Sequence, residues 1–185
     1  DINKIYSAAY PDVITGQGRR KPLVSQAIVN AINQGTLFVN YIGHGSPELW
    51  AHEVILEKSV VMPQLTNDKY FFLTAATCDF GYFDIPNYQS AAEAIMFLPT
   101  SGAIASFTAA RLVYSGLNHQ LNYRIVDELF KSQRDTLNLS IPIGKASFNS
   151  KQTFTGINDQ KYNIFGDPTL RLLVPQYSAI IDSIN

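Results

Sequence analysis

The sequence predicts a doubly wound α/β domain built on a mostly parallel central sheet. Three apolar segments, 36–42, 69–77 and 101–109, have the composition of buried strands, and segments with helical spacing alternate with them. This alternation is typical of a parallel sheet that helices cover on both faces. The length of 185 residues and the 46% share of hydrophobic residues suit one globular domain with a sizeable core.

The first part of the chain is expected to run from a loop into a helix and then a strand. Residues 10–22 are rich in Gly, Pro and Arg and predict a loop. Residues 22–35 predict a helix, with Pro22 in its first turn and Gly35 as its C-cap. Its expected apolar stripe consists of Leu23, Ala27, Ile28, Ala31 and Ile32. The segment 36–42 shows little polar alternation, so we expect a strand buried on both faces.

The middle of the chain repeats the pattern. The strand at 69–77 is followed by an expected helix at 87–99. Ser90 and Glu93 have the spacing of a capping box, which marks the start of that helix. The strand at 101–109 comes next.

The last part of the chain adds two helices and a strand. A long amphipathic helix is expected from about 115 to 130. Its apolar stripe consists of Leu117, Leu121, Ile125, Val126, Leu129 and Phe130. A weaker helix is expected at 141–151, and residues 165–175 predict a turn followed by a last strand.

Charge and hydropathy exclude two classes of partner. The net charge is −1, from 14 Lys and Arg against 15 Asp and Glu, so no basic field exists to attract nucleic acid. The longest apolar runs are shorter than the about 20 residues that a membrane span needs. The chain begins at Asp1 rather than Met, and we expect it to be a piece of a longer protein.

Two residues with reactive side chains follow two successive strands. His44 stands between two glycines just after the first strand, and Cys78, the only cysteine, stands just after the second. Ligands of open parallel sheets bind outside the carboxyl ends of the strands. The 34 residues between them (78 − 44) allow one crossover, which would make the strands parallel neighbours. Their Cα atoms would then lie roughly 6–9 Å apart.

A thiol and an imidazole at that separation can act as a nucleophile and a base. A thiol is only about a few per cent ionised at neutral pH, and a histidine can take its proton and later protonate a leaving amine. The N–H groups of Gly45 and Cys78 are the candidate oxyanion donors. From the pattern alone, a turn at the glycines and a buried structural cysteine remain open.

Two roles are open for each of the other residues near these strand ends. Trp50, Glu53, Tyr82 and Phe83 lie in the loops after the two strands, where they either line a substrate pocket or cover the edge of the sheet. Arg111, beyond the third strand, either meets a substrate carboxylate or pairs with a structural acid.

The two other histidines and Asp167 are weaker candidates. His52 is a poor second base because nothing in the sequence constrains its loop position, and His119 inside a helix is expected to be structural. His44, His52 and Cys78 lack the short-spaced ligand pairs of zinc sites, so a metal site is not favoured. Asp167, in a Gly-Asp-Pro turn, is expected to shape the backbone.

Four ordered motifs resemble the gingipain family of cysteine peptidases. They are "NYIGHGSPELWAHE", "LTAATCDFGYFDIP", "SAAEAIMFLPTSGAIASFTAARLVYS" and "YNIFGDPTLRL", and together they cover nearly the whole chain. Within the family, the chain looks closest to the sortases of the type IX secretion system, the PorU type. The resemblance implies a caspase-like three-layer α/β sandwich with a mostly parallel central sheet. It also implies that 1–176 is the catalytic second subdomain and that 177–185 starts a following segment or tail.

The resemblance also assigns roles to residues of the site. His44 matches the family's catalytic histidine, Cys78 its nucleophile, and Gly45 the glycine whose amide helps to form the oxyanion hole. No cofactor is required, although a structural calcium ion is allowed, with Asp79 and Asp84 as candidate ligands. Family members can orient the histidine with an acid that precedes it, but no acid, Asp12 included, can be assigned that role.

The implied biology is the removal of the C-terminal signal domain from cargo of the type IX secretion system. The expected partners are those cargo proteins and outer-membrane components of the system, at the cell surface of a Bacteroidetes-type bacterium. A thioester at Cys78 would be resolved by water, as in a peptidase, or by an amine of lipopolysaccharide, as in a transpeptidase. Two alternatives stay open: a general secreted protease of the same family, and a docking module that is inactive without its upstream half.

Overall fold

The computed structural model describes residues 1–134, 140–152 and 156–173. Their largest sheet has four strands in the order β3-β6-β7-β8, of which the first three are parallel and β8 is antiparallel to β7. The strands are β3 (Phe38–Ile42), β6 (Phe71–Ala76), β7 (Ala103–Ala109) and β8 (Tyr162–Phe165). The predicted α/β class with a mostly parallel sheet is confirmed.

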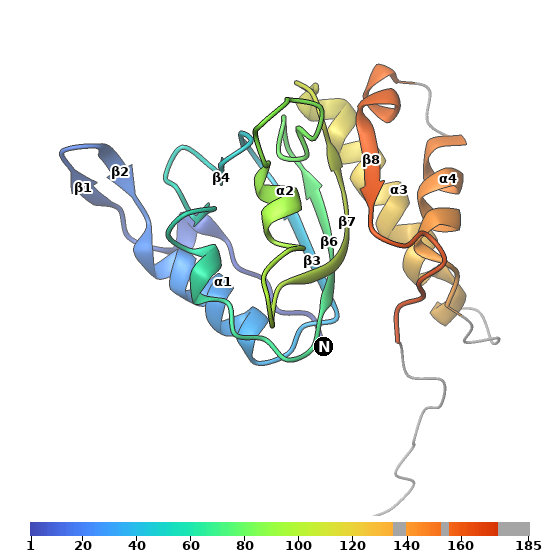
Figure 1. Cartoon of the computed structure of the whole chain (residues 1–185), viewed down its shortest axis with the longest axis horizontal. Helices are drawn as coiled ribbons and strands as arrows, with labels where there is room; N and C mark the ends of the chain where they lie inside the picture. The colour runs from blue at the N-terminus through green and yellow to red at the C-terminus, as the bar shows by residue number, and fades with distance from the viewer. Residues whose placement is uncertain (135–139, 153–155, 174–185) are drawn as a thin grey trace, which may run out of the picture.

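Helices cover both faces of this sheet. They are α1 (Pro22–Asn33), α2 (Ala91–Ala94), α3 (Ser115–Arg134) and α4 (Ile143–Gln152). Figure 1 shows α1 and α2 on one side of the sheet and α3 and α4 on the other, which makes three layers. None of the helices in the described ranges combines the length and hydropathy that crossing a bilayer requires.

Each face of the sheet has its own hydrophobic core. Side chains alternate along a strand, so Phe71 and Leu73 of β6 pack toward α1 while Phe72 packs toward α3. The stripe of α3 is confirmed, because Leu121, Ile125 and Leu129 are all buried. Burying such side chains contributes about 1.5–3 kcal/mol each, so the two cores hold the sheet between its helices.

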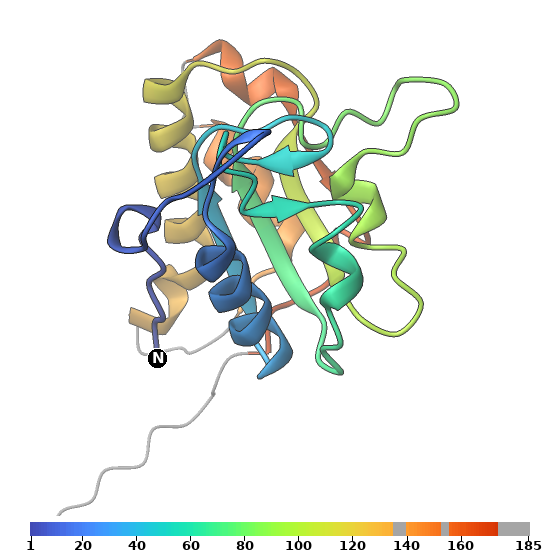
Figure 2. The ribbon, with the colours of Figure 1, turned by 90° about the vertical axis from the view of Figure 1, so that its left-hand side faces the viewer.

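Smaller elements lie outside this four-stranded sheet. Strands β4 (Leu49–Trp50) and β5 (Leu56–Glu57) form a short antiparallel pair, and β1 (Val13–Thr15) and β2 (Gly18–Arg20) form a hairpin. Three short 3₁₀ helices are η1 (Ser7–Ala9), η2 (Met62–Gln64) and η3 (Ile157–Lys161). In Figure 2 the hairpin and α1, both blue, lie in front of the sheet.

Local sequence signals gave several correct boundaries. Pro22 is the first residue of α1, and Gly35 follows that helix in the left-handed region at φ +97°. Ser90 caps α2, and Ser90 and Glu93 form the predicted capping box. A cap predicts where a helix begins, and here it did.

Five expectations were wrong in detail. Residues 10–22 contain the β1–β2 hairpin rather than only a loop. Strand β3 is an edge strand of the described sheet and is only half-buried, because it has a partner on one side alone. In α1 the buried residues are Val24, Val29 and Ile32, whereas Leu23 is 55% exposed.

The other two errors concern where elements end. Helix α2 stops at Ala94 rather than near 99, because the C=O of Ile95 accepts a hydrogen bond from Ala103 at the start of β7. The last strand, β8, precedes the Gly-Asp-Pro turn instead of following it. The predicted tail at 177–185 lies outside the described residues.

Candidate active site

His44 and Cys78 occupy equivalent positions on neighbouring parallel strands. The β3–β6 pairs run from Phe38 with Phe72 to Ile42 with Ala76, so partners differ by 34 residues throughout. His44 and Cys78 differ by the same 34 (78 − 44), and each lies two residues beyond the last pair. The predicted parallel neighbourhood of the two strands is therefore confirmed. The sheet brings the two residues to the same level at its carboxyl edge.

The Cys78 thiol is half-buried against the α3 side of the sheet. Its Sγ accepts a hydrogen bond from the N–H of Val113 at 3.4 Å and donates to the C=O of Val113 at 3.6 Å. Val113 lies between β7 and α3. Val113, in the next crossover, thus both donates a hydrogen bond to the thiol and accepts one from it.

A buried amide fixes that segment in turn. Asn158 of η3 donates from Nδ2 to the C=O of Tyr114 at 2.9 Å and accepts at Oδ1 from the N–H of Tyr114 at 3.2 Å. Its Nδ2 also donates to Asn118, and the Tyr162 hydroxyl donates to the same Asn118 oxygen. Burial, with a smaller contribution from the nearby Cys78, raises the pKa of Tyr162, which therefore stays a neutral donor.

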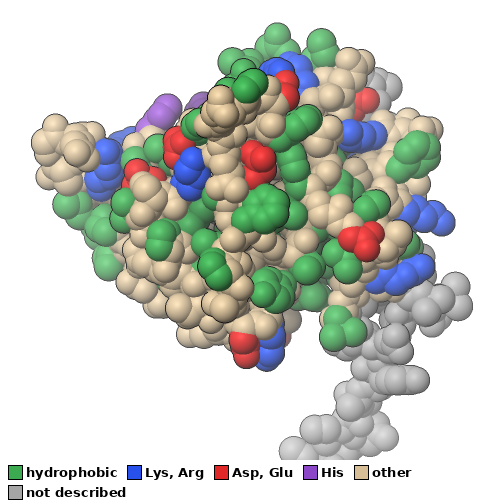
Figure 3. Space-filling view, in the orientation of Figure 1, with side chains coloured by type: hydrophobic (Ala, Val, Ile, Leu, Met, Phe, Trp, Pro, Cys, Tyr) green, Lys and Arg blue, Asp and Glu red, His purple; other side chains and the backbone are tan. Residues whose placement is uncertain are grey.

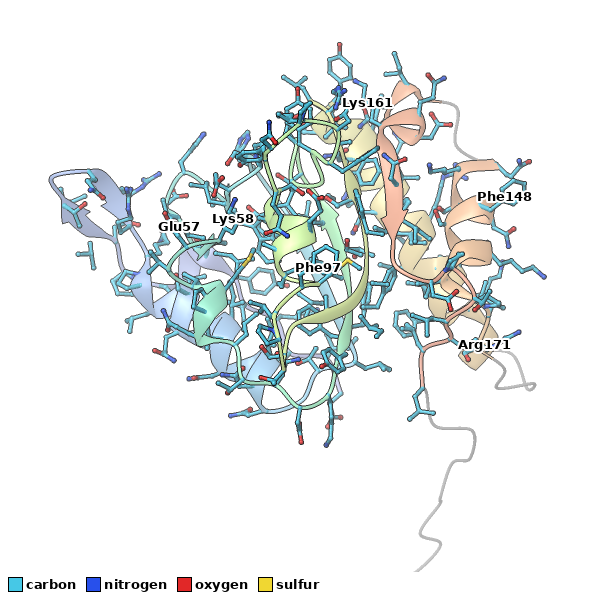
Figure 4. The ribbon with its side chains drawn as sticks, viewed as in Figure 1. Glu57, Lys58, Phe97, Phe148, Lys161 and Arg171 are labelled. Carbon is cyan, nitrogen blue, oxygen red and sulfur yellow. The ribbon has the colours of Figure 1, made fainter. Side chains whose placement is uncertain are left out.

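Lys161 also contacts the segment around Val113. Lys161 donates from Nζ to the C=O of Leu112 at 2.7 Å, and its ammonium group lies 5.3 Å from the ring centroid of Tyr114. Figure 4 shows Lys161 at the upper edge of the molecule, near the start of β8. Backbone and side-chain contacts therefore fix the residues around Val113 from two sides.

His44 is exposed and belongs to the segment of residues 43–54, which we name the histidine loop. Its imidazole stacks on that of His52, with ring centroids 5.0 Å apart and an angle of 17° between the planes. The backbone C=O of His44 accepts hydrogen bonds from the N–H of Ala51 and from the Tyr41 hydroxyl, both at 2.7 Å. Burial, with the charge of Glu53 adding, raises the pKa of Tyr41. Figure 3 shows histidine side chains on the surface at the upper edge of the molecule.

The two side chains are not joined by a hydrogen bond in the described part of the chain. Among the hydrogen bonds of the described ranges, none joins His44 to Cys78, because the thiol is engaged by Val113 and the imidazole stacks on His52. Catalytic hydrogen bonds of unliganded enzymes are often long or absent and form only with substrate. The catalytic pairing of His44 with Cys78 stays a prediction.

Gly45 has a packing role that the sequence did not indicate. A Cβ there would lie 2.4 Å from Thr77 Oγ1 and 3.1 Å from the Leu49 C=O, so only glycine fits between β6 and the short strand β4. Gly45 also forms an isolated antiparallel bridge with Trp50. In the part of the chain that the structure describes, the N–H groups of Gly45 and Cys78 have no acceptor. Both groups are thus free to meet a ligand oxygen.

The four residues predicted to line a pocket have separate surroundings. Trp50 is a correction: it is 2% exposed and stacks on Tyr41 with ring centroids 4.2 Å apart, so it covers the sheet edge instead of lining an open pocket. The Glu53 carboxylate pairs with Arg19 of β2 at 2.6 Å. The remaining two stay at the surface after β6. They are Tyr82, beneath the guanidinium of Arg111 at 4.7 Å, and Phe83, whose ring packs edge-on against Phe165.

Charged residues near the site are paired within the chain. Arg111 makes two hydrogen bonds to Asp84, which lower the pKa of that carboxyl and raise the pKa of the guanidinium. Asp12 pairs with Lys21 and Arg19 and does not orient His44. Arg111 therefore has the structural acid that was one of its two predicted partners.

No described group of three or more His, Cys, Asp or Glu residues is placed to hold a metal ion. His119 is exposed on α3. Asp167 accepts hydrogen bonds from the backbone N–H and the hydroxyl of Thr169, which lower the pKa of its carboxyl. It shapes the turn after β8, as the sequence predicts.

Sequence reasoning missed most of what surrounds the two residues. Val113, Thr77 and Asn158 carry no motif, because their roles come from backbone groups and from burial. His52 was considered only as a second base, although it is the side chain that stacks on His44.

The fold, with its histidine and cysteine at neighbouring strand ends, defines a caspase-like α/β domain. The model of peptidase family C25 matches residues 1–173, and the chain belongs to this family. No curated protein sequence matches the chain. The family membership expected from the four motifs is confirmed.

Solved structures show the same fold. The Arg-specific cysteine proteinase gingipain R has 22% sequence identity and a TM-score of 0.68, over 80% of this chain and 36% of that one. The complex of the Porphyromonas gingivalis RgpB pro- and mature domains gives 22% identity and a TM-score of 0.66, over 82% and 37%. A structure described as a protease gives 22% and 0.63, over 78% and 37%. This chain thus spans little more than a third of their length, and the gingipain-like caspase fold is confirmed.

Proposed function

We propose that this chain carries the His–Cys dyad of a cysteine peptidase, with Cys78 as nucleophile and His44 as general base and acid. The observation that carries the proposal is the common register of the two residues at the carboxyl edge of β3 and β6. Membership of peptidase family C25 supports it. A nearby imidazole supplies what a thiol lacks at neutral pH, which is an acceptor for its proton.

The proposed reaction uses groups of the chain alone. His44 takes the thiol proton, and the Cys78 thiolate attacks the carbonyl carbon of the scissile peptide bond. The N–H groups of Gly45 and Cys78, which have no acceptor among the described residues, stabilise the oxyanion in this proposal. Collapse of the tetrahedral intermediate breaks the C–N bond, His44 protonates the leaving amine, and a thioester remains on Cys78. No cofactor takes part in these steps.

The reaction must begin with two local changes. The thiol has to leave the C=O of Val113, to which it donates, and the imidazole has to approach it. The N–H of Val113 can stay in place, because a donor to sulfur favours the thiolate. Substrate binding at the carboxyl edge would drive both changes.

The finer proposal is that the protein is a sortase of the type IX secretion system. Its substrates are secreted proteins with a C-terminal signal domain, and it works at the outer membrane or cell surface together with other components of that system. The motifs "NYIGHG" and "TAATCDFGYFD" at the two strand ends support this branch of the family. Water or an amine of lipopolysaccharide resolves the thioester. The pairing of Glu53 and Asp84 with arginines of the chain does not favour the rival, a protease specific for basic residues.

The test is Cys78→Ala in the full-length protein, assayed on cargo that carries a C-terminal signal domain. We expect the variant to leave all cargo unprocessed while its thermal unfolding matches that of the wild type. Undiminished processing would refute the assignment of Cys78. If the wild-type protein instead cleaved unrelated proteins after one type of basic residue, the general protease would be established.

A further inference from the structure

The histidine loop contains strained backbone that the proposed reaction does not explain. Ala51 at φ +60° and Val54 at φ +56° are both in the left-handed region, and they flank His52 and Glu53. A β-branched residue such as Val54 is an outlier there. Each such residue costs on the order of 1–3 kcal/mol and persists only where the surrounding structure requires it.

Contacts on both sides hold this conformation in place. The N–H of Ala51 donates to the His44 C=O at 2.7 Å, and the N–H of Val54 donates to the Ala51 C=O at 3.1 Å. From β2, Arg19 pairs with Glu53 at 2.6 Å. The result is that the chain turns back sharply and places the His52 ring over the His44 ring, 5.0 Å away and 17° from parallel.

The stack with His52 is a ring contact of His44 that leaves the imidazole nitrogens without a hydrogen-bond partner among the described residues. Within the described residues, no side chain or backbone group makes a hydrogen bond to the ring nitrogens of His44, and Asp12 is paired elsewhere. A stacked ring contacts the π-face of an imidazole and leaves the two nitrogens in its plane free. Those nitrogens are the ones that must take a proton from the thiol and give it to the leaving amine.

We propose that His52 is a positioning residue for His44, which orients the imidazole by stacking on its face. This proposal rests on the proposed function of His44. The strained residues Ala51 and Val54 serve this placement, because a relaxed loop would not bring residue 52 back over residue 44.

The test compares variants that remove or keep a flat ring at position 52. Cys78 is the only cysteine, so its alkylation by iodoacetamide near neutral pH reports on one thiol. We expect His52→Ala to slow alkylation about two- to tenfold, the range that loss of an aromatic pair gives. His52→Phe should retain a rate within about twofold of the wild type. His119→Ala changes an exposed side chain of α3 and should leave the rate unchanged.

Two outcomes would overturn the proposal. One is a wild-type rate in His52→Ala, and the other is a rate in His52→Phe as low as in His52→Ala, since the ring nitrogens rather than the stack would then matter. His52 is exposed, so neither variant should unfold the chain. Equal thermal unfolding of all variants is the control.

A second measurement separates this proposal from the dyad itself. The chain has three histidines, so its imidazole proton resonances can be assigned by their loss in single variants. His52→Ala should move the His44 resonance, and His119→Ala should not. An unmoved His44 resonance would show that the stack is absent. A moved resonance together with an unchanged alkylation rate in His44→Ala would refute the dyad and leave the stack standing.

Discussion

The two ends of the candidate site are supported in opposite ways. The histidine loop (residues 43–54) follows the half-buried edge strand β3, and surface contacts, a stacked ring and strained backbone hold it. The end of β6 follows a fully buried strand, and the Val113 backbone and a buried amide network hold Cys78 there. The proposed nucleophile is therefore fixed by the core, and the proposed base is held by contacts that can be changed at little cost in stability.

This difference fits the chemistry of the two groups. A nucleophile must be placed accurately against the substrate carbonyl, and a base must move between the thiol and the leaving amine. The buried side provides accuracy, and the exposed side allows the movement.

Asn158→Ala should have the largest effect, because it removes a fully buried amide. The N–H of Tyr114 loses its only acceptor, and a buried unsatisfied group of this kind costs about 1–3 kcal/mol. The C=O of Tyr114 and the Asn118 side chain each lose one of their two donors. We expect the free energy of unfolding in urea to fall by about 2–4 kcal/mol, and Cys78 alkylation to change with it. Gln160→Ala, exposed in the same 3₁₀ helix, is the control and should cost less than about 0.5 kcal/mol. A similar small loss in Asn158→Ala would mean that the network does not fix this end.

Gly45→Ala should have an intermediate effect, since Gly45 is where the two ends touch. The new methyl group would meet Thr77 Oγ1 at 2.4 Å, and such overpacking costs about 1–3 kcal/mol. Because Thr77 Oγ1 is buried without a partner, Thr77→Ala in the same chain should restore much of the loss in unfolding free energy. Gly16→Ala, with open space around it, should leave that energy nearly unchanged. If Thr77→Ala gave no rescue, the clash would not be the cause.

Arg19→Gln should have the smallest effect on stability. Its ion pair with Glu53 is at the surface, where such pairs contribute about 0–1 kcal/mol. The change should nevertheless speed hydrogen exchange at the Ala51 N–H, because Glu53 anchors the strained end of the histidine loop. Arg20→Gln removes the same charge from the same hairpin without touching Glu53. Equal exchange rates in the two variants would show that the ion pair does not anchor the loop.

The sequence predicted the features that depend on local pattern. The buried strands β6 and β7, the stripe of α3 and the cap of α2 all have signals within a few residues. The placement of His44 and Cys78 at neighbouring strand ends followed from one crossover length, and the register of β3 with β6 confirms it.

What the sequence did not predict depends on contacts between distant segments. Strand β8 is four residues long and is defined by its pairing with β7, some 55 residues earlier in the chain (163 − 108). Trp50 is buried because Gly45 lets β4 fold against the sheet. The stack of His52 requires left-handed backbone at an alanine and a valine, and neither residue type indicates such a turn.

The left-handed residues of the histidine loop also bear on how the protein can change. Glycine adopts their conformation without a steric penalty, so a glycine at position 51 or 54 would be the simplest way to a more stable chain. The same change would free the backbone to leave the geometry that aligns the two rings. Selection for thermal stability would therefore favour glycine at these two positions, and selection for turnover in the proposed reaction would disfavour it. A stabilised variant obtained there should catalyse that reaction more slowly.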